Sequence, residues 1–347
     1  MKEAKRNYLI DVFRYIFALD VVFMHQHPLE DLHYNFSPFI TVIWPRLAVI
    51  FFMMVSGYFY TNALVDEKGK GVYLRYIWKL LKPLLLWSCV YFFIDNRNLE
   101  FEHGLLRTFI NYTLYSVGSS FHLWFMVDLL IVVSLITLLY KLKCFNILIY
   151  ISILLGIIGI LNNSYSTVVS QISIFSFLNK ILNWRVARVL YTPLPFAVFG
   201  YYIGYINEKW NSKRKLLILC MLLIVTNILA IPEVNLICKL NVDGVYGNTF
   251  CACIDNILLF WIMLAATNKE SNVIKYVSNK CKIASSFTYY SHILFIKIIQ
   301  VMNKHIFNSN LNSVGIYVCV IITTFIVAQA KDYILRRAGN FRHIIKD

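Results

Sequence analysis

The sequence predicts an all-α, polytopic integral membrane protein with about ten transmembrane helices. Hydrophobic residues make up 59% of the 347 residues and charged residues only 15%. The mean hydropathy is +0.62, far from the norm for soluble domains. Apolar windows of about 20 residues, the length that crosses a bilayer as a helix, recur along the whole chain. Lys and Arg are also divided unequally between the segments that join these windows.

Ten windows qualify as spans, and they account for the whole chain. We therefore expect a single membrane domain over 1–347 without a soluble domain. The stretch 168–184 is better explained by a helix lying in the interface, or a re-entrant segment, than by an eleventh span. The expected spans are residues 8–25, 39–62, 72–94, 121–140, 145–161, 190–206, 215–231, 249–267, 283–303 and 313–335.

The distribution of basic residues predicts the orientation. With the N-terminus inside, the six inside segments hold 23 of the 33 Lys and Arg residues, and the five outside loops hold 7. Cytoplasmic loops carry such an excess, so both termini are expected in the cytoplasm. The net charge of +15 is therefore explained by the membrane topology and by contact of the cytoplasmic loops with anionic lipids. Nucleic acid is not an expected partner.

The first expected span, 8–25, contains Asp11, Arg14, Asp20 and His25. A charged residue at membrane depth costs about 3 kcal/mol even on the lenient insertion scale. On a helix, Arg14 and His25 lie about 20° apart in azimuth and roughly 16 Å apart in depth. Asp11 shares their stripe and Asp20 points to the opposite face. This pattern indicates a reaction path, and the alternative is a packed helix whose polar groups pair with neighbours for structure alone.

The same charges show that the N-terminus is not a cleaved signal, because they interrupt its apolar region and no small-residue cleavage site follows. The eight cysteines are scattered along the spans. The close pair Cys251 and Cys253 has no histidine at a zinc-type spacing. We therefore interpret the cysteines as packing residues and expect no metal site.

Six short segments follow one another along the expected spans. They are Arg14 and His25 preceded by Asp11; FFMMVSGYF (51–59); Lys79-Leu80-Leu81-Lys82-Pro83 with Arg75 one turn upstream; HLWFM (122–126); TPLPFAVFGYYIG (192–204); and SSFTYYSHILF (285–295). In this order they resemble the membrane acyltransferase-3 family over nearly the whole chain. Lys replaces Arg twice in the family's basic element, and Lys does not grip a phosphate bidentately. The stretch Arg46 to Val49 also resembles a branch of the family fused to serine racemases in vancomycin-resistance systems.

The resemblance implies an integral-membrane O-acyltransferase of the bacterial cytoplasmic membrane, with acyl-CoA as co-substrate and acetyl-CoA as its expected form. The expected acceptor is a hydroxyl of an extracytoplasmic glycan or its lipid-linked precursor. Cytoplasmic Arg75, Lys79 and Lys82 are the candidates for holding the donor's phosphates. The alternative for these three is ordinary positive-inside charge with snorkelling side chains.

Within the first span, His25 is the candidate catalyst, either as a general base or as the acceptor of the acyl group itself. Arg14 would stabilise developing negative charge or orient the donor, and Asp11 at i,i+3 would hold Arg14. The sequence leaves the choice between the two roles of His25 open.

The other intramembrane polar residues are weaker candidates for a polar core or an acceptor site. Asp20 and Arg46 reach similar depths on neighbouring antiparallel spans, which favours a structural ion pair. His122 and Asp128 are candidates for lining an acceptor pocket, with helix capping as the alternative for His122. His292 is either a hydrogen-bonded core residue or a second catalytic candidate.

A function of a different class fits the same polar core. A membrane module that transports or exports a small polar solute such as serine would use it as a translocation path. The acyltransferase hypothesis requires acyl-CoA binding and dependence on His25, whereas the transport hypothesis requires solute flux without acyl-CoA. The expected partners are otherwise the lipid bilayer and the glycan acceptor, and the sequence leaves the oligomeric state open.

Overall fold

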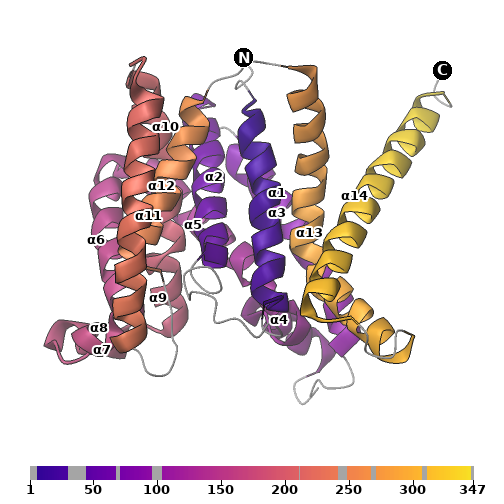
Figure 1. The fold of residues 1–347 in the computed structure, drawn as a ribbon, viewed down its shortest axis with the longest axis horizontal. Coiled ribbons are helices and arrows are strands. Elements are labelled where there is room, and N and C mark those ends of the chain that lie inside the picture. Colours follow the sequence, from indigo (N-terminus) through magenta and orange to yellow (C-terminus); the bar gives the residue numbers. More distant parts are fainter. Residues whose placement is uncertain are drawn as a thin grey trace. The chain divides into compact units, whose positions relative to one another are not determined.

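The computed structural model describes residues 6–29, 44–67, 71–95, 104–210, 212–240, 248–266, 271–306 and 311–344, without the side chains of residues 44–46, 179 and 338–344. The described residues form helices and no strand, which confirms the all-α class (Figure 1). The chain divides into two compact units. Unit one comprises residues 1–36 and 268–347, and unit two comprises residues 37–267.

Unit one consists of three packed helices: α1 (Tyr8–Gln26), α13 (Asn272–His305) and α14 (Ser313–Ile344). α1 and α13 run parallel. Asp11 contacts Ser278 near one end, and His25 stacks on His292 near the other. Both pairs have the same offset in residue number, so the two helices keep one register over about four turns.

α14 runs antiparallel to α1. Tyr15 packs on Phe325, whereas Phe23, two turns later on α1, packs on Tyr317 at the start of α14. Spans one and nine of a ten-span chain cross in the same direction and span ten crosses in the opposite one. The packing directions in unit one are therefore those that the expected topology requires.

The first helix begins and ends at defined residues. The side chain of Asn7 accepts hydrogen bonds from the backbone N–H groups of Leu9 and Ile10, at 3.0 and 3.3 Å. Such a cap satisfies donors that the first turn leaves without intrahelical partners. At the other end His27 takes a left-handed conformation with φ 49°, and its N–H donates to the carbonyl of Phe23. α1 thus ends where the expected first span ends.

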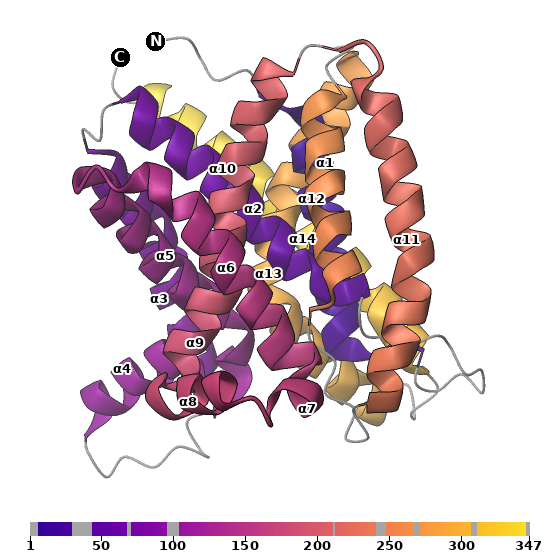
Figure 2. The same ribbon diagram turned by 90° about the vertical axis from the view of Figure 1, so that its left-hand side faces the viewer.

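Unit two contains the remaining elements (Figure 2). They are α2 (Trp44–Asp66), α3 (Val72–Asp95), α4 (Leu105–Tyr115), the 3-10 helix η3 (Gly118–Leu123), α5 (Trp124–Lys141), α6 (Phe145–Ser164), α7 (Ser166–Val169), α8 (Ser173–Ile181), α9 (Trp184–Tyr191), α10 (Pro193–Lys209), α11 (Lys215–Leu240) and α12 (Phe250–Ala265).

Two sets of long helices alternate in direction within unit two. One set contains α2, α5, α10 and α12, and the opposite set contains α3, α6 and α11. The contacts that establish this are Phe52 with Phe125 and Tyr60 with Thr137 for α2 and α5; Tyr73 with Ser134 and Tyr91 with His122 for α3 and α5; Phe145 with Tyr202 and Gly159 with Tyr191 for α6 against α9 and α10; Thr226 with Asp255 and Glu233 with Phe250 for α11 and α12; and Asn248 with Thr192 and Asn207 with Leu264 for α10 and α12.

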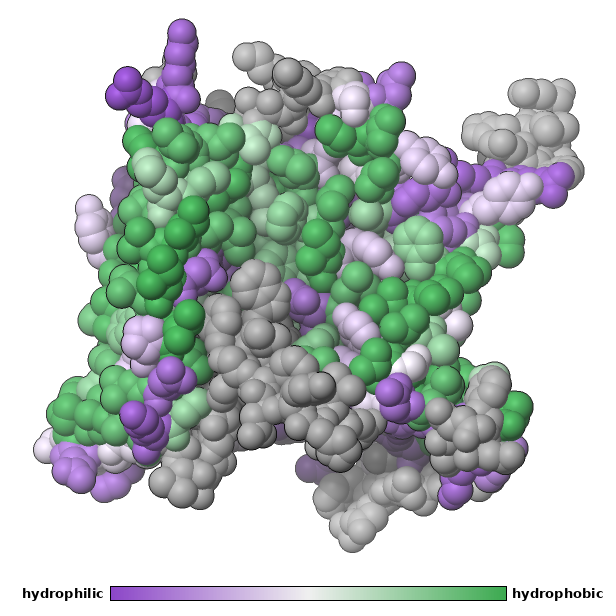
Figure 3. Space-filling model, in the orientation of Figure 1, coloured by the Kyte–Doolittle hydropathy of each residue, from purple (hydrophilic) through white to green (hydrophobic). Residues whose placement is uncertain are grey.

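Seven described helical segments are long and apolar enough to cross a membrane. They are Leu47–Asp66, Val72–Asp95, Gly118–Lys141, Phe145–Ser164, Trp184–Lys209, Lys215–Leu240 and Ser313–Arg337. Figure 3 shows the corresponding hydrophobic surface at the left, where α11 lies. On α11, Leu217, Ile224 and Ile228 are each about 60% exposed, as expected of a helix that faces lipid.

The other three expected spans are also helical, although they do not meet those limits of length and composition. α1 carries three charged side chains, and α12 has only 16 residues. The third, 283–303, lies inside the 34-residue α13, which begins at Asn272. Hydropathy identifies only the apolar part of α13. The helix itself begins earlier, in a polar segment, where the Ser271 side chain caps its first turn. The count of ten and the orientation therefore stay predictions.

The stretch 168–184 contains no single membrane-length helix. It comprises the end of α7, the nine-residue α8 and the first residue of α9. α7 and α8 run across the ends of the long helices of unit two in both ribbon views (Figures 1 and 2). This arrangement agrees with a segment that does not cross the membrane as one helix.

Glycines let α2 and α10 pack backbone to backbone. A Cβ atom on Gly57 would lie 1.9 Å from the carbonyl oxygen of Ala197, and one on Gly200 would lie 2.0 Å from that of Met54. Small residues allow this close approach between membrane helices, where dispersion contacts replace the hydrophobic effect as the driving force. FFMMVSGYF and TPLPFAVFGYYIG are thus two sides of one helix–helix contact.

We predict that Gly200→Ala lowers the stability of the protein in detergent by about 1–3 kcal/mol, because the added methyl group overlaps the backbone of α2. The matched control is Gly156→Ala on α6, where the nearest atom to the new Cβ would be Pro195 Cβ at 3.6 Å. Thermal unfolding followed by circular dichroism measures both variants. Equal unfolding temperatures for the two would contradict the close contact.

Candidate functional site

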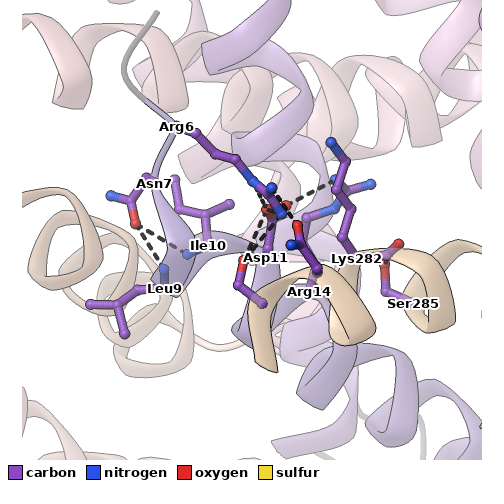
Figure 4. Close-up of polar contacts among 10 residues, drawn as sticks. Arg6, Asn7, Leu9, Ile10, Asp11, Arg14, Lys282 and Ser285 are labelled. Carbon is purple, nitrogen blue, oxygen red and sulfur yellow. Dashed lines mark hydrogen bonds and ion pairs between the residues drawn. The ribbon is translucent and has the colours of Figure 1, made fainter. Parts of the chain in front are cut away.

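A buried carboxylate organises the first turn of α1. Asp11 is 7% exposed. Its Oδ2 accepts from Arg6 Nε at 2.7 Å and from the Ser278 hydroxyl at 3.2 Å, and Arg6 Nη2 also lies 2.7 Å from it. Arg14 Nη1 approaches Oδ1 at 3.8 Å. Arg6 and Arg14 both point toward Asp11 in Figure 4, and Lys282 and Ser285 of α13 lie next to this cluster.

Arg6 connects α1 to α13 as well as to Asp11. Its Nη1 donates to Asn279 Oδ1 at 2.6 Å and its Nη2 donates to Ser278 Oγ at 3.2 Å. In the sequence, Arg6 is one of the basic residues before the first expected span that count toward the cytoplasmic side, and this role was not expected of it. A basic residue one turn before an acidic residue of a membrane helix is the signal that was available.

Arg14 is held less tightly than the sequence indicated. Asp11 is its ion-pair partner, as expected, but the shorter contacts of that carboxylate go to Arg6. The buried Nε of Arg14 has no hydrogen-bond partner among the residues that the structure describes. Arg14 therefore keeps donors available for a ligand. Its guanidinium also extends toward Asp11, away from His25, which lies roughly 16 Å further along the helix axis.

His25 and His292 form a stacked pair within unit one. Their ring centroids are 5.2 Å apart and the ring planes differ by 16°. His292 is fully buried, and its Nδ1 lies 3.1 Å from the carbonyl oxygen of Thr288 and 2.9 Å from that of Tyr289. A carbonyl only accepts, so Nδ1 carries a hydrogen and the neutral ring has its lone pair on Nε2. Two residues that the sequence placed in separate roles thus belong to one site.

The predicted ion pair between Asp20 and Arg46 lies outside the described residues, because the structure describes no Arg46 side chain. Asp20 itself is partly buried, and its Oδ2 has no hydrogen-bond partner in the described part of the chain. The pair stays a prediction.

The three proposed donor-binding residues lie on one face of α3 in unit two. Arg75, Lys79 and Lys82 are spaced by four and three residues, which places them one above the other, and all three are exposed. Arg75 forms an ion pair with Glu67 at the end of α2. The side chains of Lys79 and Lys82 extend along the same stripe.

A pocket of about 250 Å³ lies near this stripe, where the ends of α2, α3 and α5 meet. It is lined by Leu64, Gly71, Tyr73, Leu74, Thr137, Tyr140 and Lys141. Its wall offers tyrosine and threonine hydroxyls and one ammonium group. Two of its lining residues, Gly71 and Leu74, precede Arg75 on the chain.

His122 does not cap α5, contrary to one expectation. It lies in η3, is 2% exposed and packs edge-on against Tyr91 with centroids 5.1 Å apart. The N-terminus of α5 has no side-chain cap, because η3 continues directly into it and supplies backbone partners. His122 thus packs against Tyr91 and does not cap the helix, and its role in lining an acceptor pocket stays a prediction.

Asp128 forms a buried ion pair with Arg188. Its two oxygens accept from Arg188 Nε and Nη2 at 2.8 and 2.7 Å, and Asp128 is 1% exposed. The guanidinium of Arg188 lies over the ring of Trp124. In the sequence, Arg188 lies in the outside loop before the expected span 190–206, because the short helix α9 gives no hydropathy signal for a contact with α5.

Asp95 at the end of α3 was also missed. It accepts hydrogen bonds from the Tyr112 hydroxyl at 2.7 Å and from the backbone N–H and hydroxyl of Ser119 at 2.6 and 2.5 Å. Burial and the bond to Asp95 raise the pKa of Tyr112 above its ordinary value. Gly118 has φ +58°, and a Cβ there would lie 2.4 Å from the carboxylate. Asp95 therefore fixes α4 and η3 to the end of α3.

The eight cysteines, all within the described ranges, are free thiols. Among the described residues, no three His, Cys, Asp or Glu side chains gather in a group that would hold a metal ion. The expectation of a metal-free protein stays a prediction.

We predict that Asp128→Asn costs about 3–5 kcal/mol of stability, because it leaves the Arg188 guanidinium in the interior without its counterion. The matched control is Asp332→Asn, which removes the mostly exposed pair between Asp332 and Arg336 on α14 and should cost less than about 1 kcal/mol. Thermal unfolding in detergent compares the two. A loss for Asp128→Asn as small as that for Asp332→Asn would contradict a buried, geometrically fixed pair.

Comparison with known proteins identifies the family. Residues 7–331 match the family model described as an acyltransferase domain. The chain is similar to two amino-acid racemases of Enterococcus faecalis, one 24% identical over 336 residues and one 26% identical over 211 residues. It is also similar to a serine/alanine racemase of Enterococcus gallinarum, 27% identical over 217 residues.

These matches cover 92%, 59% and 61% of this chain but only 45%, 29% and 30% of the respective relatives. The chain thus spans less than half the length of the curated relatives. No solved structure matches. Because the family model covers nearly all of the sequence and the described helices include seven of membrane-spanning length, this chain is a multi-pass membrane protein that belongs to the acyltransferase-3 family.

Proposed function

We propose that this protein transfers an acyl group, with acetyl as the expected case, from cytoplasmic acyl-CoA to a hydroxyl of an extracytoplasmic glycan or its lipid-linked precursor. The observation that carries the proposal is the stacked pair of His25 and His292 on two parallel helices, in a chain that belongs to an acyltransferase family. The proposed location is the bacterial cytoplasmic membrane, with both termini inside.

In the proposed reaction, the acceptor hydroxyl attacks the thioester carbonyl carbon while His25 removes the hydroxyl proton. The new C–O bond forms, the C–S bond breaks, and the departing CoA sulfur takes up the proton from the His25 imidazolium. General-base catalysis requires a neutral imidazole at the start. A cationic His25 would lie 5.2 Å from the second ring in a low-dielectric interior, which disfavours charge on either of them.

The anchoring of His292 supports a positioning role for this residue. Its Nδ1 is held by two backbone carbonyls, so its ring cannot rotate freely. A ring fixed in this way holds the stacked His25 ring in one plane and lets it meet the acceptor in a constant orientation. This role does not distinguish a general base from a covalent acyl carrier at His25.

Arg14 is better suited to the donor than to the reacting carbonyl. Its guanidinium extends toward Asp11, one helix segment away from His25, and its Nε has no protein partner among the described residues. A cation at that depth orients an extended anionic donor whose thioester lies closer to His25. Asp11 would then hold the Nη1 end of the Arg14 guanidinium in place, and Arg6 would hold Asp11.

The exposed stripe on α3 is the proposed site for the donor's phosphates. Arg75, Lys79 and Lys82 present three cations along one face, and the adjacent pocket offers hydroxyl groups. Phosphates far from the thioester are bound equally in the ground and transition states. Their loss therefore raises KM more than it lowers kcat.

A second function is favoured by the names of the similar proteins. All three relatives are named as racemases of amino acids, and this chain covers less than half of each. A membrane module that moves an amino acid such as serine is therefore the alternative. Purified protein in proteoliposomes separates the two proposals: transfer from labelled acetyl-CoA supports the first, and uptake of labelled serine without acetyl-CoA supports the second.

We predict that His25→Ala lowers acyl transfer by about 10²- to 10⁴-fold, the range of a lost general base, while membrane insertion and folding are kept. The matched control is His305→Ala, which removes an exposed histidine near the end of α13 and should leave the rate within about twofold. Transfer of labelled acetyl-CoA is the measurement. A loss below tenfold for His25→Ala would count against its catalytic role.

We predict that Arg14→Ala lowers the rate of acyl transfer about as much as His25→Ala does. Asp11→Asn should be milder, because the amide still accepts a hydrogen bond and Arg14 keeps its charge. Initial rates of acetyl transfer at saturating and limiting acetyl-CoA measure both variants. The order would be wrong if Asp11→Asn reduced the rate more than Arg14→Ala.

We predict that replacing Arg75, Lys79 and Lys82 together with Ala raises KM for acetyl-CoA more than it lowers kcat. Wild-type affinity should also fall as salt rises, and the triple variant should be less sensitive to salt, since screening acts on the charges that were removed. The control is the triple variant of Lys209, Lys213 and Arg214 to Ala, three other basic residues on the expected cytoplasmic side. Titration with acetyl-CoA at two ionic strengths measures the affinities of the wild type and both triple variants. If the wild type and the Arg75, Lys79 and Lys82 variant bind acetyl-CoA equally well, these residues form a cytoplasmic rim that only sets topology, and not a donor site.

A further inference from the structure

One arginine in unit two lies in a cluster of aromatic rings without a described acidic partner. The Arg185 guanidinium lies over the ring of Tyr115, 3.4 Å from its centroid, and 4.9 Å from the Trp184 ring centroid. The carboxylate of Asp128, which also acts on Arg185 electrostatically, is already bound bidentately by Arg188. Within the described ranges, no carboxylate forms an ion pair with Arg185.

The elements that hold Arg185 are fixed independently of it. Tyr115 ends α4, which Asp95 anchors through Tyr112. Arg188, one turn after Arg185 on α9, is anchored by Asp128 on α5. The Asn183 side chain accepts from the backbone N–H of Arg185 and starts α9. The guanidinium is thus held flat between two anchored helices.

A stacked guanidinium keeps its N–H groups available. Stacking uses the face of the planar group, whereas its donors lie in the plane and point outward from the edges. This geometry matches the bidentate recognition of a phosphate or carboxylate. An anion bound there would also pair with a partly buried cation that forms no ion pair with a described carboxylate.

The surroundings indicate a ligand at the membrane surface. Trp184 is 61% exposed and Tyr115 47% exposed, and the apolar Ile181 and Val186 beside them are 62% and 48% exposed. Exposed Trp and Tyr next to exposed aliphatic side chains are typical of the depth at which lipid headgroups lie. α7 and α8, which cross the ends of the long helices, border the same end of unit two (Figure 2).

We propose that Arg185, with Tyr115 and Trp184, forms a binding site for the phosphate group of a membrane lipid. Arg185 binds the phosphate oxygens, and the exposed aromatic and aliphatic side chains contact the apolar part of the lipid. The lipid is either a phospholipid or an isoprenoid phosphate of the kind that carries glycan precursors. The site stands independently of the acyltransferase proposal, since none of its residues belongs to the His25 cluster.

Binding to purified, detergent-solubilised protein tests the site. The probes are dihexanoyl phosphatidylglycerol, farnesyl diphosphate, inorganic phosphate and, as a lipid without phosphate, dihexanoylglycerol. Arg185→Gln should weaken binding of the phosphate-bearing lipids by about tenfold or more. Lys180→Gln is the matched control, because it removes one positive charge from neighbouring α8, where the side chain is exposed; it should change affinity by less than about twofold.

The probes distinguish the two sources. Tighter binding of phosphatidylglycerol than of farnesyl diphosphate identifies a phospholipid, and the reverse order identifies an isoprenoid phosphate. Equal affinity for inorganic phosphate and the lipids would overturn a lipid site, as would equal affinity for dihexanoylglycerol. Equal losses in Arg185→Gln and Lys180→Gln would show only a diffuse charge effect and would also overturn it.

Two further variants keep the test decisive if Arg185→Gln fails to fold. Arg185→Lys keeps the charge but loses the planar fork, so an intermediate loss of affinity is expected. Tyr115→Leu keeps the charge and an apolar side chain but removes the stacked ring, and it should also weaken binding several-fold. Wild-type affinity in both variants would contradict the proposed geometry.

Discussion

The buried carboxylate of Asp11 is the contact on which the arrangement of unit one depends. Arg6 and Ser278 bind it directly, and Arg6 continues to Asn279 on α13. α1 and α13 are far apart in sequence and run parallel, so no short loop sets their register. A charge-assisted network does so, and the register that it sets is the one in which His25 lies opposite His292. The ion-pair network and His25 thus lie along one stripe of α1.

In unit two, buried carboxylates likewise fix the positions of neighbouring elements. Asp95 holds α4 and η3 to α3, and Asp128 holds α9 to α5. Each carboxylate lies where a membrane helix meets a short irregular element. A buried carboxylate is costly unless its oxygens are satisfied, so each one specifies the position of the element that supplies the donors. α4, η3 and α9 are therefore attached at defined places.

The candidate groups for acyl transfer are distributed along a path instead of gathered at one point. On α1, Arg14 extends toward the end of the helix that is expected to lie in the cytoplasm, and His25 lies toward the other end. This separation suits an extended donor that is held by its anionic part and reacts at its far end.

The sequence by itself determined the helical membrane class and the stripe of Asp11, Arg14 and His25, because hydropathy and helical periodicity depend only on local order. The family followed from the resemblance of its short motifs and from the family model. Only the tertiary structure decided what these residues contact. Arg6 and not Arg14 is the main partner of Asp11, His292 joins His25, and His122 packs against Tyr91. It likewise paired Arg188 with Asp128. These contacts join residues 5 to 267 positions apart, and no periodic pattern in the chain encodes which distant helix will lie alongside.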